Sequence, residues 1–282
     1  DGSVGLPNCG RVAIEAITIL QQGVISANAL EQGTAGEIEI VSQDSTVLDE
    51  ASTTEARALG LAGSGGRILI DSKGGNTVVN KNAVIDVSAG AISGNGGFIE
   101  VSAFDQLGFY GVLNGRAPPG YQIGTAILDP TDATIGNSSF NTDTTVWAIN
   151  NITIVGDVTL ADGVTLILLA DHNSENPADW DDDGIGQILR SGNYTISGSA
   201  ANLILIAGNG IGTSSYPIKT NIANLATLVL NGNTYIEQGS TNLTVHVIIA
   251  LFGGDLYLTA AGSILDDSTD YEYTNVDYGL LL

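Results

Sequence analysis

The sequence predicts an all-β chain folded as a right-handed parallel β-helix, and three observations lead to this prediction. A short pattern recurs five times in the first half, its apolar residues alternate, and no stretch shows the apolar spacing of a helix. Alternation at every second residue is typical of strands with one buried face. A repeat of this length buries its apolar face only by stacking on its neighbours, which builds one continuous core.

Each copy of the repeat is a glycine followed by alternating apolar positions. The copies start at Gly10, Gly36, Gly66, Gly97 and Gly124, at spacings of 26, 30, 31 and 27 residues. We expect each glycine to adopt a positive φ where the chain turns a corner. The residues expected to face outward are Arg11, Glu37, Arg67 and Glu100, and those expected to face inward are Val12, Ile14, Ile38, Ile40, Ile68, Ile70, Ile99 and Val101.

A second short strand is expected between copies, for example at 23–27, 83–88 and 110–113. A β-sandwich is the alternative fold, but its strands are antiparallel and usually vary in sequence. Here the same strand returns in the same phase, which favours parallel stacking of like on like.

The chain divides into three sections by the regularity of the repeat. Residues 1–130 carry the regular coils, 131–150 are rich in Asp, Thr, Asn and Ser, and 151–282 hold a looser repeat. The middle section is predicted to be a loop-rich transition. The strands expected in the last section are 164–170, 203–207 and 256–260.

The charge balance is strongly acidic, with 31 Asp and Glu against 8 Lys and Arg. Nucleic acids and anionic membranes need a cationic surface, so neither is an expected partner. Cations, cationic surfaces and neutral glycans fit this charge, although acidity also serves solubility alone. No apolar run approaches the ~18 residues of a membrane span.

The single cysteine, Cys9, excludes a disulfide within the chain. The sequence contains no methionine and no basic segment followed by an apolar one, as a signal peptide would have. We therefore expect a processed product or an internal segment of a longer protein.

Four segments resemble the filamentous-haemagglutinin-like exoproteins of Gram-negative bacteria, which are exported by two-partner secretion. These segments are 96–103, 128–132, 203–212 and 253–264. The resemblance covers most of the chain and implies a right-handed parallel β-helix at the cell surface, with roles in adhesion, matrix or contact. The family's amino-terminal secretion domain carries Asn-Pro-Asn motifs, and this sequence has none. The resemblance is therefore to the shaft that follows that domain, or to a related filament protein.

Parallel β-helices also include polysaccharide lyases and hydrolases, so catalysis is an alternative. A lyase needs a cationic base beside carboxylates or calcium, whereas the cations here are scattered, and only Arg190 lies near an acidic cluster. His172 and His246 lie far apart, and neither adjoins a nucleophile motif. His246 alternates with apolar residues, so we expect it on the outer face of a strand.

The sharpest local signal is an acidic segment, 179–187. Carboxylates at alternate positions followed by Gly184 match the start of a calcium-binding loop. The match ends at the twelfth position, where Arg190 replaces the bidentate Glu of an EF-hand. An exposed acidic loop without an ion is the alternative. The expected ligands of Ca²⁺ are Asp179, Asp181, Asp183, Ile185 and Gln187.

We expect an extracellular, non-catalytic β-solenoid shaft or filament subunit with an adhesive role. Its expected partners are copies of itself joined end to end, or further coils of a longer chain, together with glycans or cell surfaces. The alternatives are a polysaccharide-active enzyme and a calcium-dependent binding module. Acceptor sequences for N-glycosylation occur at Asn137, Asn151, Asn193 and Asn242, although chance accounts for several in a chain rich in Asn and Thr.

Overall fold

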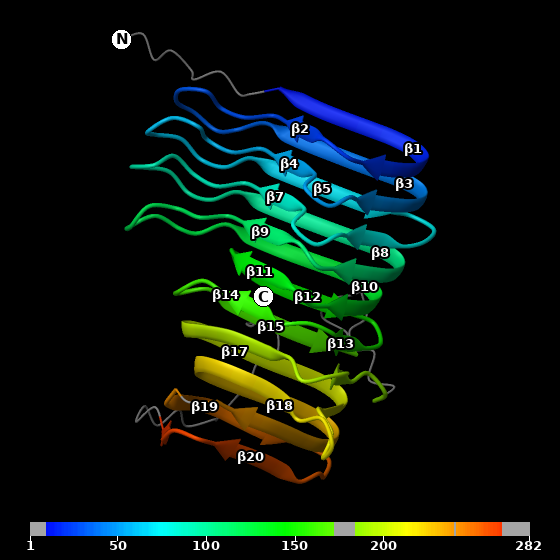
Figure 1. Ribbon diagram of the computed structural model, residues 1–282, viewed down its shortest axis with the longest axis vertical. Helices are drawn as coiled ribbons and strands as arrows, with labels where there is room; N and C mark the ends of the chain where they lie inside the picture. The colour runs from blue at the N-terminus through cyan, green and yellow to red at the C-terminus, as the bar shows by residue number, and fades with distance from the viewer. Residues whose placement is uncertain (1–9, 172–183, 240, 267–282) are drawn as a thin grey trace.

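The computed structural model describes residues 10–171, 184–239 and 241–266, and all elements in these ranges are strands. Hydrogen bonds join the strands into one sheet of 21 strands, and all the strand pairs are parallel. This confirms the prediction of an all-β chain with parallel strands. Within those ranges no helix is long and apolar enough to cross a membrane. Figure 1 shows the successive strands stacked along the longest axis of the molecule.

The first of three ladders runs from one end of the stack to the other. Each pass of the chain adds one strand to it, paired in parallel with the strand of the pass before. Its strands are β1 (Arg11–Gln21), β3 (Glu37–Leu48), β5 (Arg67–Ser72), β8 (Phe98–Phe109), β10 (Thr125–Ile135), β12 (Asp143–Ala148), β15 (Thr165–Ala170), β17 (Thr195–Ile211), β18 (Ile218–Gln238), β19 (Leu243–Ala250) and β21 (Ile264–Asp266).

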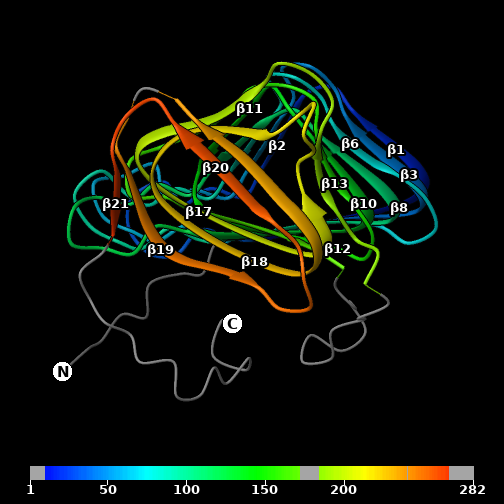
Figure 2. The same cartoon turned by 90° about the horizontal axis from the view of Figure 1, so that it is seen from below.

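Two further ladders form the other sides of the stack. Several long strands bend and continue from one ladder into the next. Seen along the stack in Figure 2, the strands enclose a common interior. The second ladder contains the ends of β1, β3, β8, β10, β17 and β18, together with β6 (Thr77–Val79), β13 (Ile152–Ile154), β16 (Ile188–Arg190) and β20 (Leu256–Ala260). The third contains β2 (Val24–Ser26), β4 (Thr53–Glu55), β7 (Val84–Asp86), β9 (Val112–Asn114), β11 (Ser138–Asn141), β14 (Val158–Leu160) and the beginnings of β17 and β18.

The core is a set of columns in which similar residues from successive passes lie on one another. Such stacking places Ile, Val and Leu side chains in contact along the whole interior. The burial of this apolar surface is the main stabilising term in a repeat fold. Phe109 and Phe140 add a buried ring pair with centroids 5.5 Å apart. One of these columns, in register from pass to pass, is Ile14, Ile40, Ile70, Val101, Leu128, Val146, Leu168, Leu205 and Thr227.

The repeat strands are confirmed, but the predicted reason for their glycines is wrong. The inward residues of β3, β5 and β8 are fully buried, as expected. Gly36, Gly66 and Gly97 do not have a positive φ; each lies against the carbonyl oxygen of the matching glycine one pass earlier, where no Cβ fits. The positive φ values of this region fall three residues earlier, at Gly33, Gly63 and Gly94.

The segment 131–150 is not the loop-rich transition that its polar composition predicts. It contains the end of β10 and the whole of β11 and β12, and all three continue the stack. Its inward positions include Ser138, Thr142 and Thr144, which are buried. Because Thr has the shape of Val, it fills inward positions of a strand while making the sequence look like a loop.

The outer face of the first ladder changes along the stack. On β1 to β8 it carries charged side chains in ion pairs, such as Arg67 with Glu37 and with Glu100. On the later strands several outward positions are apolar, so the alternation that marks the earlier repeats fades. One outward column, in register, is Trp147, Leu169, Ile206, Leu228 and Ile249.

Candidate functional site

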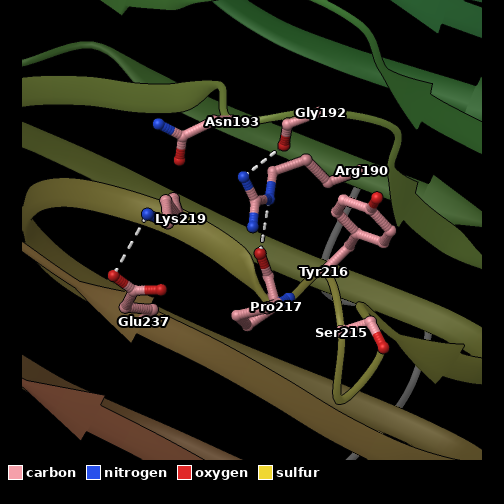
Figure 3. Close-up of a pocket in the computed structure, with 8 residues that line it drawn as sticks. All are labelled: Arg190, Gly192, Asn193, Ser215, Tyr216, Pro217, Lys219 and Glu237. Atoms are coloured by element: carbon pink, nitrogen blue, oxygen red, sulfur yellow. Dashed lines mark hydrogen bonds and ion pairs between the residues drawn. The ribbon is translucent and has the colours of Figure 1, made fainter.

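A shallow groove with a volume of about 240 Å³ lies on the outer surface between three passes of the chain (Figure 3). Arg190 ends β16 and Asn193 follows it, Tyr216 lies in the turn between β17 and β18, and Lys219 and Glu237 lie on β18. These residues are brought together by stacking, because each pass places its own corner beside the corner of the next.

Arg190 forms the inner wall of the groove, and its side chain is held in place on several sides. The residue is only 6% exposed. Its Nε donates to the Pro217 carbonyl oxygen at 2.6 Å, and Nη1 donates to the Gly192 carbonyl oxygen. The guanidinium also lies over the Tyr216 ring, 5.9 Å from its centroid. Burial lowers the pKa of Arg190, while the nearby Glu237 acts in the opposite direction.

Lys219 forms the facing wall, where its Nζ lies 3.3 Å from a carboxylate oxygen of Glu237. Within the described ranges, Arg190 has no carboxylate within ion-pair distance. The groove therefore combines two cations with one anion, and among the described residues the hydrogen bonds of the guanidinium go to the neutral carbonyl groups of Pro217 and Gly192. Such a guanidinium is able to bind an anionic group by further N–H bonds.

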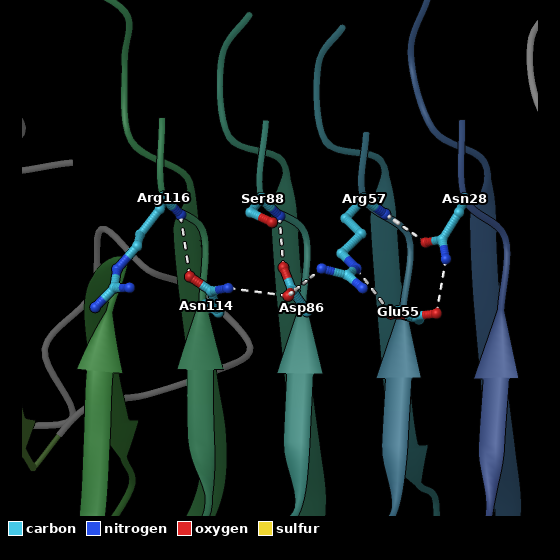
Figure 4. A network of polar contacts seen from close by, with 7 residues as sticks. All are labelled: Asn28, Glu55, Arg57, Asp86, Ser88, Asn114 and Arg116. Atoms are coloured by element: carbon cyan, nitrogen blue, oxygen red, sulfur yellow. Dashed lines mark hydrogen bonds and ion pairs between the residues drawn. The ribbon is translucent and has the colours of Figure 1, made fainter. Parts of the chain in front are cut away.

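A second polar arrangement follows the third ladder, at the ends of β4, β7 and β9 (Figure 4). Asp86, which is nearly buried, accepts hydrogen bonds from the Ser88 backbone N–H at 2.8 Å and from the Asn114 amide at 2.9 Å. Arg57 bonds to Glu55 at 2.8 Å and lies 3.9 Å from Asp86. These groups satisfy one another and the turn backbone, so this polar ladder is a structural element that fixes the corner.

Asp129 is the acidic residue with the most perturbed environment on the outer face of β10. Burial raises the pKa of Asp129 to about 6, and the neighbouring carboxylates of Glu100 and Asp71 add to this effect. Desolvation and like charges both favour the neutral form of a carboxyl group. Asp129 is therefore a protonation site in the mildly acidic range.

The predicted calcium loop falls largely outside the described residues, which exclude Asp179, Asp181 and Asp183. Of the expected ligands, Ile185 is exposed, and the backbone N–H of Gln187 donates to the Asn151 side chain at 3.1 Å. Across 10–171, 184–239 and 241–266, no group of three or more His, Cys, Asp or Glu residues is arranged to hold a metal ion. Calcium binding by this loop stays a prediction.

The other predicted positions are placed as follows. His246 is exposed on β19, as expected, with its Nε2 3.2 Å from the Asn224 side-chain oxygen, whereas His172 and Cys9 lie outside the described residues. Among the glycosylation acceptors, Asn193 lines the groove and the Asn151 amide donates to Asp132 at 3.3 Å. Asn137 has a φ of 51°, and the Asn242 side chain accepts from the Ser263 backbone.

Comparisons of the chain with models of protein families, with curated proteins and with solved structures found no match.

The groove was not among the sites predicted from the sequence, although the sequence contains a signal for it. Arg190 and Lys219 are the only cations after Arg116 in the sequence. They are 29 residues apart, which is close to one pass of the repeat, so stacking was able to bring them together. An isolated pair of cations in a strongly acidic region, separated by one repeat length, was the pattern to look for.

Proposed function

We propose that the chain is a stretch of a right-handed parallel β-helix that serves as a structural and adhesive shaft outside the cell and does not catalyse a reaction. The observation that carries the proposal is the parallel pairing that continues through the whole first ladder, from Arg11 on β1 to Asp266 on β21, with one register shift between β18 and β19. A chain that adds one strand per pass, with like residues stacked, grows in length and not in thickness.

The ion pairs of the outer face support a structural role over a catalytic one. A lyase of this shape needs a cation that is able to act as a base. Arg11, Arg57, Arg67 and Lys73 all lie within ion-pair distance of carboxylates. The three arginines each reach a carboxylate on a neighbouring pass, whereas Lys73 pairs with Asp71 on its own pass. Exposed ion pairs contribute little each, but a row of them fixes the register of the stack.

Exposed apolar residues on the outermost described strands support stacking against further coils or another copy of the chain. Ile17 and Leu20 on β1 are well exposed, as are Ile264 and Leu265 on β21. A further parallel strand on either side would cover them and extend the core. The resemblance to filamentous exoproteins supports the extracellular location and the adhesive role.

Removal of one complete pass tests the shaft. Deletion of residues 67–97 joins Gly66 to Phe98 and sets β3 against β8, with Ile38 opposite Ile99, because both pair with Ile68 in the intact chain. We expect cooperative unfolding and the circular dichroism of β structure to persist. Small-angle scattering should show a particle shorter by about 4.8 Å, the spacing of one strand.

Deletion of residues 67–82 is the matched control, because it removes half a pass and leaves the remaining strands out of register. We expect this variant to lose cooperative unfolding. Equal damage from the two deletions would contradict a shaft of interchangeable passes. Non-catalysis is tested separately, by incubating the intact chain with acidic and neutral polysaccharides and measuring new reducing ends, which should stay at the level of the blank.

A further inference from the structure

We propose that the groove between Arg190 and Lys219 binds a uronate residue, a sugar that carries a carboxylate, within a largely neutral polysaccharide. The proposal goes beyond the shaft and stands whether or not the shaft proposal holds. It rests on the charges that line the groove, on the fixed position of the guanidinium, and on the mixture of donors and acceptors around them.

The carboxylate is the part of the ligand that Arg190 selects. The contacts to Pro217 and Gly192 use two of the five N–H groups of the guanidinium. Three N–H groups remain, and the planar fork would bind a carboxylate that reaches them from the groove in two-point fashion. Because the side chain is already fixed by those carbonyl groups and by Tyr216, binding costs little side-chain entropy.

Glu237 determines what else the ligand must carry. Its carboxylate, paired with Lys219 at 3.3 Å, repels a ligand that presents only negative charge to the groove. Sugar hydroxyl groups donate as well as accept, so they bond to Glu237 while the uronate carboxylate bonds to Arg190. The amide of Asn193 and the hydroxyl of Ser215 offer further partners of both kinds at the rim.

Tyr216 supplies an apolar surface beside these polar groups. The residue is 50% exposed, and the guanidinium lies over its ring. The C–H face of a sugar ring packs on an aromatic ring and removes apolar surface from water, which a small phosphate or sulfate ion does not do. The groove is shallow and open, which suits one residue of a chain that continues on both sides.

The net charge of the whole chain limits how many anionic residues the bound polysaccharide can carry. With a net charge of −23, the protein repels a polymer in which every residue is anionic. At physiological ionic strength charges are screened beyond about 8 Å, so a single uronate senses mainly the charges of the groove. Uronate residues spaced by neutral sugars therefore fit better than a continuous polyuronate.

The test is an NMR titration with two methyl glycosides that differ only in the carboxylate, methyl galacturonoside and methyl galactoside. The protein is produced in a host that does not glycosylate Asn193. We expect the galacturonoside to shift the backbone amides of Gly192 and Asn193 with a Kd of about 1–10 mM, as is usual for one small ligand in an open groove. The galactoside should bind at least tenfold more weakly, and equal binding of the two would overturn the proposal.

Two variants distinguish the effect of the charges in the groove from the effect of the net charge of the chain. Lys219→Gln should raise the Kd of the galacturonoside about fivefold or more, because it removes a positive charge from the groove. The fold should tolerate the change, because the Lys219 side chain is not buried. Lys81→Gln removes the same charge from an exposed residue between β6 and β7 and should leave the Kd unchanged. Identical behaviour of the two variants would show that the Lys219 charge is not part of the site and would overturn the assignment.

N-acetylalanine, a peptide-like carboxylate, tests the choice of a sugar. It should bind wild type at least tenfold more weakly than the galacturonoside, and Glu237→Gln should narrow this difference by relieving the repulsion of a simple anion. If N-acetylalanine binds wild type as tightly as the galacturonoside, the groove is a general carboxylate site and the saccharide assignment fails.

Discussion

Asp86 and Asn114 occupy matching positions on β7 and β9, and the Asn114 amide donates to the Asp86 carboxylate at 2.9 Å. Asn141 takes the same position on β11, where its side-chain oxygen accepts from Arg116 at 3.0 Å. The same residue type thus faces a carboxylate in one pass and a guanidinium in the next. The repeat therefore keeps a polar side chain at this position, and the residue on the neighbouring pass determines whether that side chain donates or accepts.

Asn114→Asp should destabilise the chain by about 2 kcal/mol at pH 7, because it replaces a donor to Asp86 with a second carboxylate. The like charges raise the pKa of the new pair in the folded state, so the loss should be largest at neutral pH and shrink as the pH falls and one carboxyl group is protonated. Asn141→Asp is the matched control. It places the same charge against Arg116 and should change stability by less than about 1 kcal/mol. Chemical denaturation at pH 4 and pH 7 measures both.

Gly97→Ala should destabilise the chain by about 3 kcal/mol. The added Cβ would lie far inside the contact distance of the Gly66 carbonyl oxygen, and backbone atoms of the adjacent pass have no room to move. Gly23→Ala meets no atom within 4 Å and does not have a left-handed φ, so it should leave stability unchanged or raise it by up to about 1 kcal/mol. A similar loss for both would mean that chain flexibility, and not close approach, explains the repeated glycines. Thermal unfolding of the two variants decides between these explanations.

Ser72→Ala should cost about 1–3 kcal/mol, because Ser72 is the middle of a buried hydroxyl chain. The Ser42 hydroxyl donates to Ser72 at 3.0 Å, and Ser72 lies 2.8 Å from Thr77, which itself donates to the Ser102 carbonyl oxygen. Removing Ser72 leaves a buried donor and a buried acceptor without partners. Ser52→Ala is the control: Ser52 is equally buried, but within the described ranges its hydroxyl has no hydrogen-bond partner. Ser52→Ala should leave stability unchanged or raise it. If the two variants lowered the denaturant midpoint of unfolding by the same amount, the stabilising role of the hydroxyl chain would be contradicted.

The sequence was sufficient to predict the parallel strands of the first half, because the inward and outward faces of these strands differ in polarity. Ile38, Ile68 and Ile99 each adjoin at least one charged residue on the outer face, and the structure buries all three. After residue 130 the alternation fails for two physical reasons. The polar Thr144 takes an inward position, and the apolar Trp147 and Leu169 take outward positions, so the two faces no longer differ clearly in polarity.

The groove was harder to predict than the strands, because it depends on which corners of the chain become neighbours. The register of the looser half could not be read from the sequence, so the pairing of Thr195 with Lys219 was not foreseen, and with it the approach of Lys219 to Arg190. The close approach of Gly97 to Gly66 has the same origin, since it is a property of stacked passes and not of local backbone preference.

Asp129→Asn should raise stability at pH 7 by about 1–2 kcal/mol, since one pKa unit corresponds to 1.36 kcal/mol and Asp129 keeps some contact with water. Burial, with Glu100 and Asp71 nearby, raises the pKa of Asp129 to about 6 in the folded chain, whereas an unfolded Asp titrates near 3.9. Between these values the folded state holds the proton more tightly than the unfolded state does, so the contribution of Asp129 to stability falls as the pH rises from about 4 to 6.

The gain from Asp129→Asn should therefore be small at pH 4, grow through pH 5 and reach its full size above pH 6. Denaturant unfolding of both proteins at these pH values measures the gain. Asp44→Asn removes the same charge from an exposed position on β3 and controls for the change in net charge. A gain that is the same at every pH, or that Asp44→Asn reproduces, would place the effect in the overall charge of the chain. A gain that appears only with Asp129→Asn and follows its titration would assign it to the buried carboxyl group on β10.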